Sequence, residues 1–199
     1  DIQWDSFLTE AVGKGLKGKQ LYNAIPHRRM SATIYKNYPQ GKITVTDFLL
    51  GQYYLYEDAL NSQEWNIESD SMKVVLGHEC QKATCSFRGR KWTAWFALDV
   101  PVSDGPLKFC GLPGLIMEVY DRGKQYYFCI NGMQQVSATP ITFGILDKDF
   151  KHFQKTDRKD FLLSKYRYLR NQNSINEAST GISLGSVDEA LKYDLIERE

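Results

Sequence analysis

The sequence has no excess of charge of either sign. It contains 25 Lys and Arg residues against 24 Asp and Glu residues, which leaves a net charge of +1 at pH 7. A balance this even gives no electrostatic basis for binding nucleic acid or an acidic membrane surface. No apolar run approaches the roughly 18 residues that a membrane-spanning helix needs. We therefore expect no nucleic-acid partner and no transmembrane segment.

The chain also lacks an initiator methionine and an apolar signal segment, since it begins at Asp1. We expect a processed protein whose signal peptide has been removed, or one that has been trimmed. Its 199 residues are enough for one domain with a substantial core, without help from metals or disulfides. The 12 Tyr and 10 Phe residues favour strands.

Short strands joined by tight turns are predicted through the middle of the sequence. The runs are rich in aromatic or β-branched residues and are bounded by Gly, Pro or polar residues. Arg88-Gly89-Arg90 is predicted to be a hairpin turn, because Gly89 can take the positive φ that a tight hairpin requires. Consecutive strands of this kind predict an antiparallel meander. They are expected over residues 31–38, 42–48, 52–57, 64–68, 74–76, 80–87, 91–98, 115–120 and 125–130.

Helical patterns flank the strands. Apolar residues spaced as on one helix face predict helices over residues 4–12 and 157–170. Residues 171–185 are low in apolar side chains and are predicted to form a mobile linker. Ser186-Val187-Asp188-Glu189 has the pattern of a capping box that starts a last helix.

These elements predict one α+β domain over residues 1–199. Its core is a twisted antiparallel β-sheet over about 31–145, and N- and C-terminal helices pack on or near the sheet, the C-terminal helical segment covering about 156–199.

Gly111-Leu112-Pro113-Gly114-Leu115-Ile116 lies at the centre of the most apolar part of the chain. Pro113 fixes its own φ and has no N–H group, while the two glycines permit close backbone approach. The hexapeptide is not a phosphate loop, since no Lys-Ser/Thr follows it. It is predicted to be a packed bend between two buried strands, and the alternative is a ligand-binding loop.

The hexapeptide and its surroundings resemble the GLPGLI family, which is named after this motif. The segments that carry the resemblance are Leu76-Gly77-His78-Glu79-Cys80-Gln81-Lys82-Ala83, Phe87-Arg88-Gly89-Arg90, Trp92-Thr93-Ala94-Trp95-Phe96 and Gly105-Pro106-Leu107-Lys108-Phe109. The resemblance runs from about residue 37 to about 133. It implies an exported protein of Gram-negative bacteria whose function is unassigned, and it supplies no catalytic residues. A curved sheet with a helix across it is also similar to the lipoprotein-carrier architecture of the periplasm, an analogy that fixes no function.

The four cysteines are even in number and lie close together in the sequence. The count fits two disulfides in an oxidising compartment, or four free thiols in a cytosolic protein. The resemblance to an exported family favours disulfides. Strand parity then predicts the pairs Cys80–Cys129 and Cys85–Cys110, because it places the first pair on the wetter face and turns the second pair inward.

The candidate ligand-binding residues are the turn residues Arg88 and Arg90 with the aromatic residues Trp92, Trp95, Tyr126 and Tyr127. Trp92 and Trp95 are three residues apart, so on a strand they point to opposite faces. We expect one to fill the core and the other to line an apolar cleft with Tyr126 or Tyr127. The alternative for these aromatic residues is packing in the core or at its rim.

Two functions from different classes remain open. The first is a non-enzymatic binding or carrier module of the periplasm or cell surface, which holds an apolar or peptidic ligand and possesses no cofactor, metal site or catalytic residue. The second is a thiol- or metal-dependent enzyme that uses His78 and the cysteine cluster. A role as partner of an outer-membrane complex is compatible with the first.

Overall fold

The computed structural model describes residues 10, 13–16, 32–137, 152–180 and 195–197 of the chain. The chain divides into two units, Asp1–Ala32 and Thr33–Glu199. In the first unit, the backbone N–H of Lys14 donates to the carbonyl oxygen of Glu10, and their side chains pair at 2.6 Å. Most of the helix predicted over residues 4–12 lies outside the described residues, as does the capping box.

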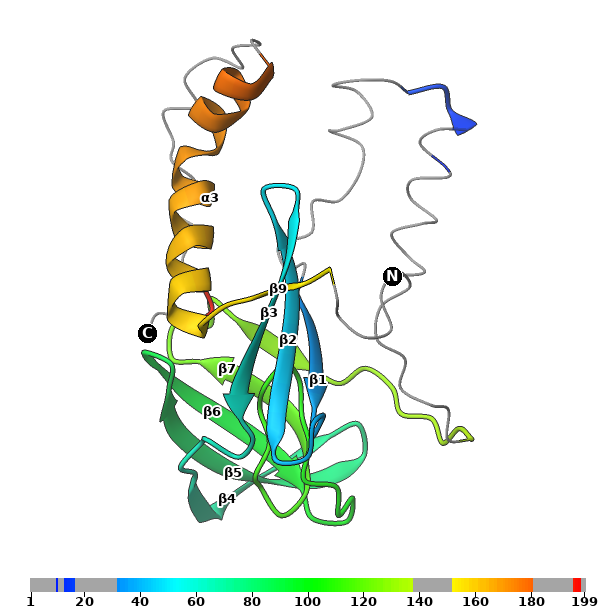
Figure 1. Cartoon of the computed structure of the whole chain (residues 1–199). Coiled ribbons are helices and arrows are strands. Elements are labelled where there is room, and N and C mark those ends of the chain that lie inside the picture. The colour runs from blue at the N-terminus through cyan, green and yellow to red at the C-terminus, as the bar shows by residue number, and fades with distance from the viewer. Residues whose placement is uncertain (1–9, 11–12, 17–31, 138–151, 181–194, 198–199) are drawn as a thin grey trace. The chain divides into compact units, whose positions relative to one another are not determined.

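Two β-sheets make up most of the second unit (Figure 1). One has four strands in the order β1-β2-β3-β9, and the other has five in the order β4-β5-β6-β7-β8. The bounds in the first sheet are β1 Thr33–Lys36, β2 Lys42–Leu49, β3 Gln52–Ala59 and β9 Gln154–Lys155. Those in the second are β4 Asn66–Val75, β5 His78–Phe87, β6 Arg90–Ala97, β7 Leu115–Asp121 and β8 Tyr127–Cys129.

The predicted fold class is therefore wrong. The fold is mostly β, with two sheets in place of one and with α3 (Arg158–Thr180) as the only helix that the described residues contain in full. The chain leaves the first sheet after β3, and Asn61 takes a positive φ of 56° in the connection to β4. The outer neighbour of β3 is instead β9, which pairs with it in parallel from about 100 residues further along the chain. No local sequence pattern reports such a pairing.

Three of the hairpins close with two-residue turns of the same type. Arg88-Gly89, Leu76-Gly77 and Leu50-Gly51 each have positive φ at both positions. This is the type I′ turn, whose twist matches that of the strands it joins. The predicted hairpin at Arg88 is thus confirmed, and β4 to β8 form the antiparallel meander expected from the spacing of the runs.

The main core lies on one face of the five-stranded sheet. It contains Ala83, Trp92, Ala94, Phe96 and Val119 from the strands. Phe109 and Leu112 join this core from the long connection between β6 and β7, although neither belongs to a strand. The connection folds back on the sheet because its apolar side chains are buried there.

The hexapeptide forms the end of this connection. Gly111 has a φ of 91°, and Leu112 is almost completely buried. The predicted bend is present, but no strand precedes it, because Leu107 adopts a positive φ in a turn of the loop. Beyond the bend, Leu115 begins β7 and pairs with Ala97 at the end of β6.

Helix α3 confirms the prediction of a helix over residues 157–170. The carboxylate of Asp157 accepts a hydrogen bond from the backbone N–H of Lys159 at 2.7 Å, as an N-cap does. The helix continues to Thr180 across part of the predicted linker, with a break in helical geometry at Asn171. Phe161 is buried against Tyr54 and Tyr56 of β3. Within the described residues, no helix is both long and apolar enough to cross a bilayer.

We predict that Gly114→Val is far more harmful than Gly123→Ala. A Cβ atom at Gly114 would lie 2.0 Å from the backbone oxygen of Ala97, whereas one at Gly123 would make only ordinary contacts of 3.6 Å or more. Overpacking of this kind costs at least about 1–3 kcal/mol, and surface changes usually stay within about 0.5 kcal/mol. Urea unfolding of both variants measures the difference. Equal losses of stability would show that the contact with Ala97 is unimportant.

Candidate functional site

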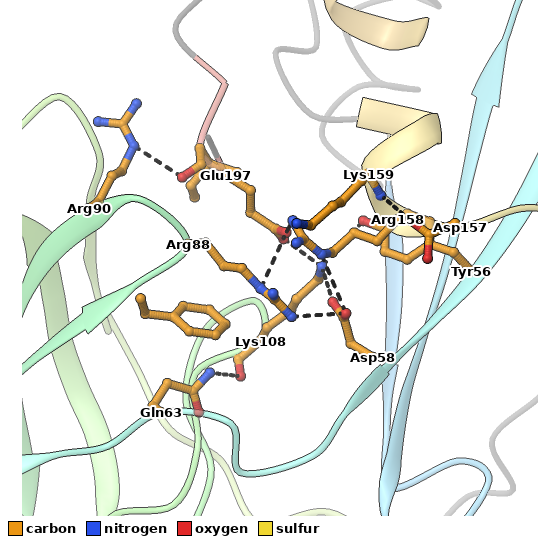
Figure 2. Close-up of polar contacts among 12 residues, drawn as sticks. Tyr56, Asp58, Gln63, Arg88, Arg90, Lys108, Asp157, Arg158, Lys159 and Glu197 are labelled. Atoms are coloured by element: carbon orange, nitrogen blue, oxygen red, sulfur yellow. Dashed lines mark hydrogen bonds and ion pairs between the residues drawn. The ribbon is translucent and has the colours of Figure 1, made fainter. Parts of the chain in front are cut away.

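The most unusual feature of the structure is a buried group of charged side chains, which we call the basic cradle. It consists of the cations Arg88, Lys108 and Arg158 around the carboxylates of Asp58 and Glu197 (Figure 2). These residues come from five parts of the chain that are remote from one another in sequence. Four of the five side chains are no more than 10% exposed, and that of Arg88 is 24% exposed.

Local structure positions each cation. The type I′ turn after β5 carries Arg88. Lys108 lies in the β6–β7 connection, directly after Leu107, whose φ is positive. Arg158 is the first residue of α3, next to the capping residue Asp157. Asp58 lies near the end of β3. The cradle therefore forms where both sheets, the long connection and the helix meet.

Lys108 makes the most contacts in the cradle. Its Nζ atom lies 2.5 Å from the carboxylate of Glu197 and 2.7 Å from that of Asp58, and it donates to the hydroxyl of Tyr56 at 3.3 Å. Its backbone carbonyl accepts a hydrogen bond from the side chain of Gln63. Burial and the nearby carboxylates of Glu197 and Asp58 raise the pKa of Tyr56, so its hydroxyl stays neutral.

Each of the two arginines of the cradle lies within 4 Å of both carboxylates. Arg88 lies 3.0 Å from Asp58 and 3.9 Å from Glu197, and Arg158 lies 3.6 Å from Asp58 and 3.3 Å from Glu197. The Nε atom of Arg88 is buried and donates to none of the described residues. Three cations thus face two carboxylates, one of which belongs to the C-terminal segment.

That segment, Leu195–Glu197, is also held through its backbone. The Nη2 and Nε atoms of Arg90 donate to the carbonyl oxygens of Leu195 and Ile196, at 2.9 and 3.0 Å. The other side of the guanidinium is fixed by Asp121 and Gln125. Arg90 is therefore held in place by groups of the sheet while it binds the backbone of the segment.

The structure brings together four of the six predicted binding residues. Arg88 belongs to the cradle, and Arg90 stacks on the ring of Tyr126 at 4.8 Å. Trp92 is only 2% exposed and lies in the core cluster against which Tyr126 and Ile196 pack. The prediction that Trp92 and Trp95 point to opposite faces is confirmed.

The other two predicted residues lie elsewhere. Trp95 packs against a smaller core cluster on the opposite face of the sheet, with Lys73 over its ring. Tyr127 is 52% exposed and borders a pocket of about 460 Å³ next to Pro106, Ile116 and Cys129. Desolvation of the charged form and the nearby groups Glu118 and Cys129 raise the pKa of Tyr127 to about 12.

All four cysteines are free, so neither predicted disulfide is formed. The parity argument placed Cys80 on a wet face, but it is completely buried beside Val75, Ala97 and Met117. Cys129, its predicted partner, is exposed. Cys80 and Ala83 have opposite parity and lie in the core clusters on opposite faces of the sheet, so alternation holds along β5. The prediction failed because it took the face of Cys80 to be wet, whereas apolar side chains cover both faces there.

The structure describes two of the groups that a thiol or metal enzyme would use, His78 and Cys80. The Nδ1 atom of His78 pairs with the carboxylate of Asp99 at 2.7 Å, while burial raises the pKa of the Cys80 thiol. Burial raises the pKa of Cys85 to about 12. In the described part of the chain, no three His, Cys, Asp or Glu side chains are placed to hold a metal ion.

Sequence reasoning missed Asp58, Lys108, Arg158 and Glu197. Charged residues are usually solvated, and no spacing links residues so far apart in the sequence. One signal was available for Lys108, which stands between the apolar residues Leu107 and Phe109.

Comparison with known proteins gives a short family match. The model of a family described as "Protein of unknown function (Porph_ging)" matches residues 88–118. The matched stretch contains Arg88, Arg90 and Lys108 together with the hexapeptide. No curated protein matches the sequence.

Two solved structures of PNGF-II, in different space groups, are similar to 63% of this chain at 16% and 17% sequence identity. This chain covers 23% of the length of those chains, and the TM-score is 0.41 for both. A TM-score of this size does not indicate a shared fold.

We predict that the native protein has one rapidly reactive thiol. Cys129 is exposed, whereas Cys80, Cys85 and Cys110 are buried and their thiol pKa values are raised. A chromogenic disulfide reagent at pH 8 should titrate one thiol in the folded protein and four after denaturation without reductant. Finding fewer than four in the denatured protein would reveal a disulfide that the structure lacks.

We also predict that Lys108→Met destabilises the protein by about 1.5–3 kcal/mol, because the carboxylates of Asp58 and Glu197 lose a buried, charge-assisted contact. Lys42→Met removes the same charge from an ion pair with Glu57 whose side chains are 51% and 39% exposed. Its effect should stay below about 1 kcal/mol. Chemical denaturation provides the comparison, and similar losses in both variants would contradict the importance of the cradle.

Proposed function

We propose that this protein is an exported, non-enzymatic binding module of the bacterial cell envelope, that it belongs to the GLPGLI family, and that its basic cradle binds a peptidic ligand through a carboxylate. The apolar part of the ligand packs beside the core cluster that contains Trp92. The observation that carries the proposal is the convergence of three cations, two of them buried, on one carboxylate of the C-terminal segment.

Charge balance supports a carboxylate ligand. Without Glu197, the cations Arg88 and Lys108 would share the carboxylate of Asp58 as their ion-pair partner among the described residues. A buried cation that lacks a partner is costly, since it has lost its hydration and gained nothing in return. The cradle therefore favours an anion at the position of Glu197, and a guanidinium suits a carboxylate in particular because its fork of N–H groups can bind both oxygens.

Arg90 supports a peptidic ligand. Its two donors bind the carbonyl oxygens of successive residues, so they recognise a peptide backbone whatever its side chains are. Asp121, Gln125 and Tyr126 hold the guanidinium from the other side. A group fixed in advance loses little freedom on binding, which increases affinity.

The location in the envelope is supported by the resemblance to an exported family, and an envelope or outer-membrane protein is the partner that this location favours. The free cysteines give this location no further support, since the expected disulfides are not formed.

Binding of a peptide to the Glu197→Gln variant tests the proposed function. This change removes the carboxylate of the resident segment and keeps its shape. We expect a fluorescent peptide with the sequence of residues 194–199, Asp-Leu-Ile-Glu-Arg-Glu, to bind the variant at micromolar concentrations, as measured by polarisation.

Two controls make this test specific. The same peptide with Gln in place of its first Glu should bind at least about ten-fold more weakly, since a charge-assisted contact of about 1.5–3 kcal/mol is lost. The double variant Glu197→Gln/Lys108→Met, if folded by circular dichroism, should lose the preference for the Glu peptide. Absence of binding, or equal binding of the two peptides to Glu197→Gln, would overturn the proposed function.

A further inference from the structure

The C-terminal segment Leu195–Glu197 is held in the second unit by side chains and not by strand pairing. None of its described residues belongs to a strand of either sheet. Its contacts come from Arg90 and from the cradle. The ladders of both sheets are complete without the segment, so it can leave without breaking a backbone hydrogen bond within a sheet.

The contacts of the segment are those of a peptide in a recognition site. Ile196 packs its side chain against the core cluster, Arg90 binds two successive carbonyl groups, and the carboxylate of Glu197 enters the cradle. Recognition of extended peptides combines the same parts: the backbone contributes affinity, and pockets for individual side chains contribute specificity.

We infer that Leu195–Glu197 is an internal ligand that occupies the binding site of its own chain. The outside ligand that fits this site is an acidic peptide with an apolar residue directly before its carboxylate. This inference rests on the proposed function and adds to it the ligand class and a competition between the ligand and the chain's own segment.

The loss of apparent peptide affinity that this competition causes can be predicted. A segment tethered to its own site acts at an effective concentration of the order of millimolar. A free peptide that binds the vacant site at about 10 μM would then appear about 100-fold weaker in the wild-type protein, since it must first displace the segment.

The first experiment compares three full-length proteins with the fluorescent Asp-Leu-Ile-Glu-Arg-Glu peptide. Wild type and Glu79→Gln, which removes a matched charge from an exposed position on β5, should bind it equally weakly. Glu197→Gln should bind it at least ten-fold more tightly. Replacing Ile by Ala in the peptide should weaken binding to Glu197→Gln, because the apolar contact is lost.

The outcomes separate the two proposals. If the peptide binds all three proteins with equal affinity and with the expected dependence on its carboxylate, the site exists but the segment does not occupy it, and the inference fails alone. Equal binding of the Ile and Ala peptides would refute the ligand class. If the peptide binds none of the proteins, the proposed function itself has failed.

A second measurement uses only the wild-type protein, so it does not depend on how the variants fold. In a sample with labelled isoleucine methyl groups, the resonance of Ile196, assigned from Ile196→Val, should lie away from random-coil values because the side chain packs beside aromatic rings. Millimolar peptide should move it to random-coil values, and the Gln peptide should not. An unchanged Ile196 signal while the peptide is bound would overturn the inference.

Discussion

The position of Lys108 between two carboxylates is the interaction on which the arrangement of this unit depends. Lys108 comes from the connection between β6 and β7, Asp58 from the four-stranded sheet, and Glu197 from the C-terminal segment. Arg88 and Arg158 bring the five-stranded sheet and α3 to the same carboxylates. Because a buried charge is costly unless it is paired, removal of any one of these parts would take ion-pair partners from the others.

Much of the local structure could be predicted from the sequence. The meander from β4 to β8 follows from short alternating runs, and the turn at Arg88-Gly89 follows from the need for positive φ. The start of α3 follows from apolar spacing and a capping Asp157. Each of these features depends on residues that are close together in the chain, where the sequence pattern carries the information.

The features that could not be predicted depend on distant residues. The strand β9 pairs in parallel with β3 through Leu55 and Lys155, and no sequence pattern near either residue indicates this pairing. The same holds for the cradle, whose members each resemble solvated surface charges when considered alone. The disulfide prediction failed for a different reason: it took the face of β5 that carries Cys80 to be wet, whereas apolar side chains bury that face as well as the other. Arg88 and Arg90 could be named as candidates from the sequence because the hairpin that carries them is a local feature.

The close contact of Gly114 with the backbone at Ala97 bears on what the hexapeptide signifies as a motif. Gly114 lies directly against the backbone at the end of β6, without room for a side-chain atom between them. The second glycine of the pattern thus reflects the close approach of two main-chain segments, while Leu112 of the same hexapeptide is buried in the core. Another sequence that carries the same six residues is therefore expected to share this backbone approach, whatever the two proteins bind.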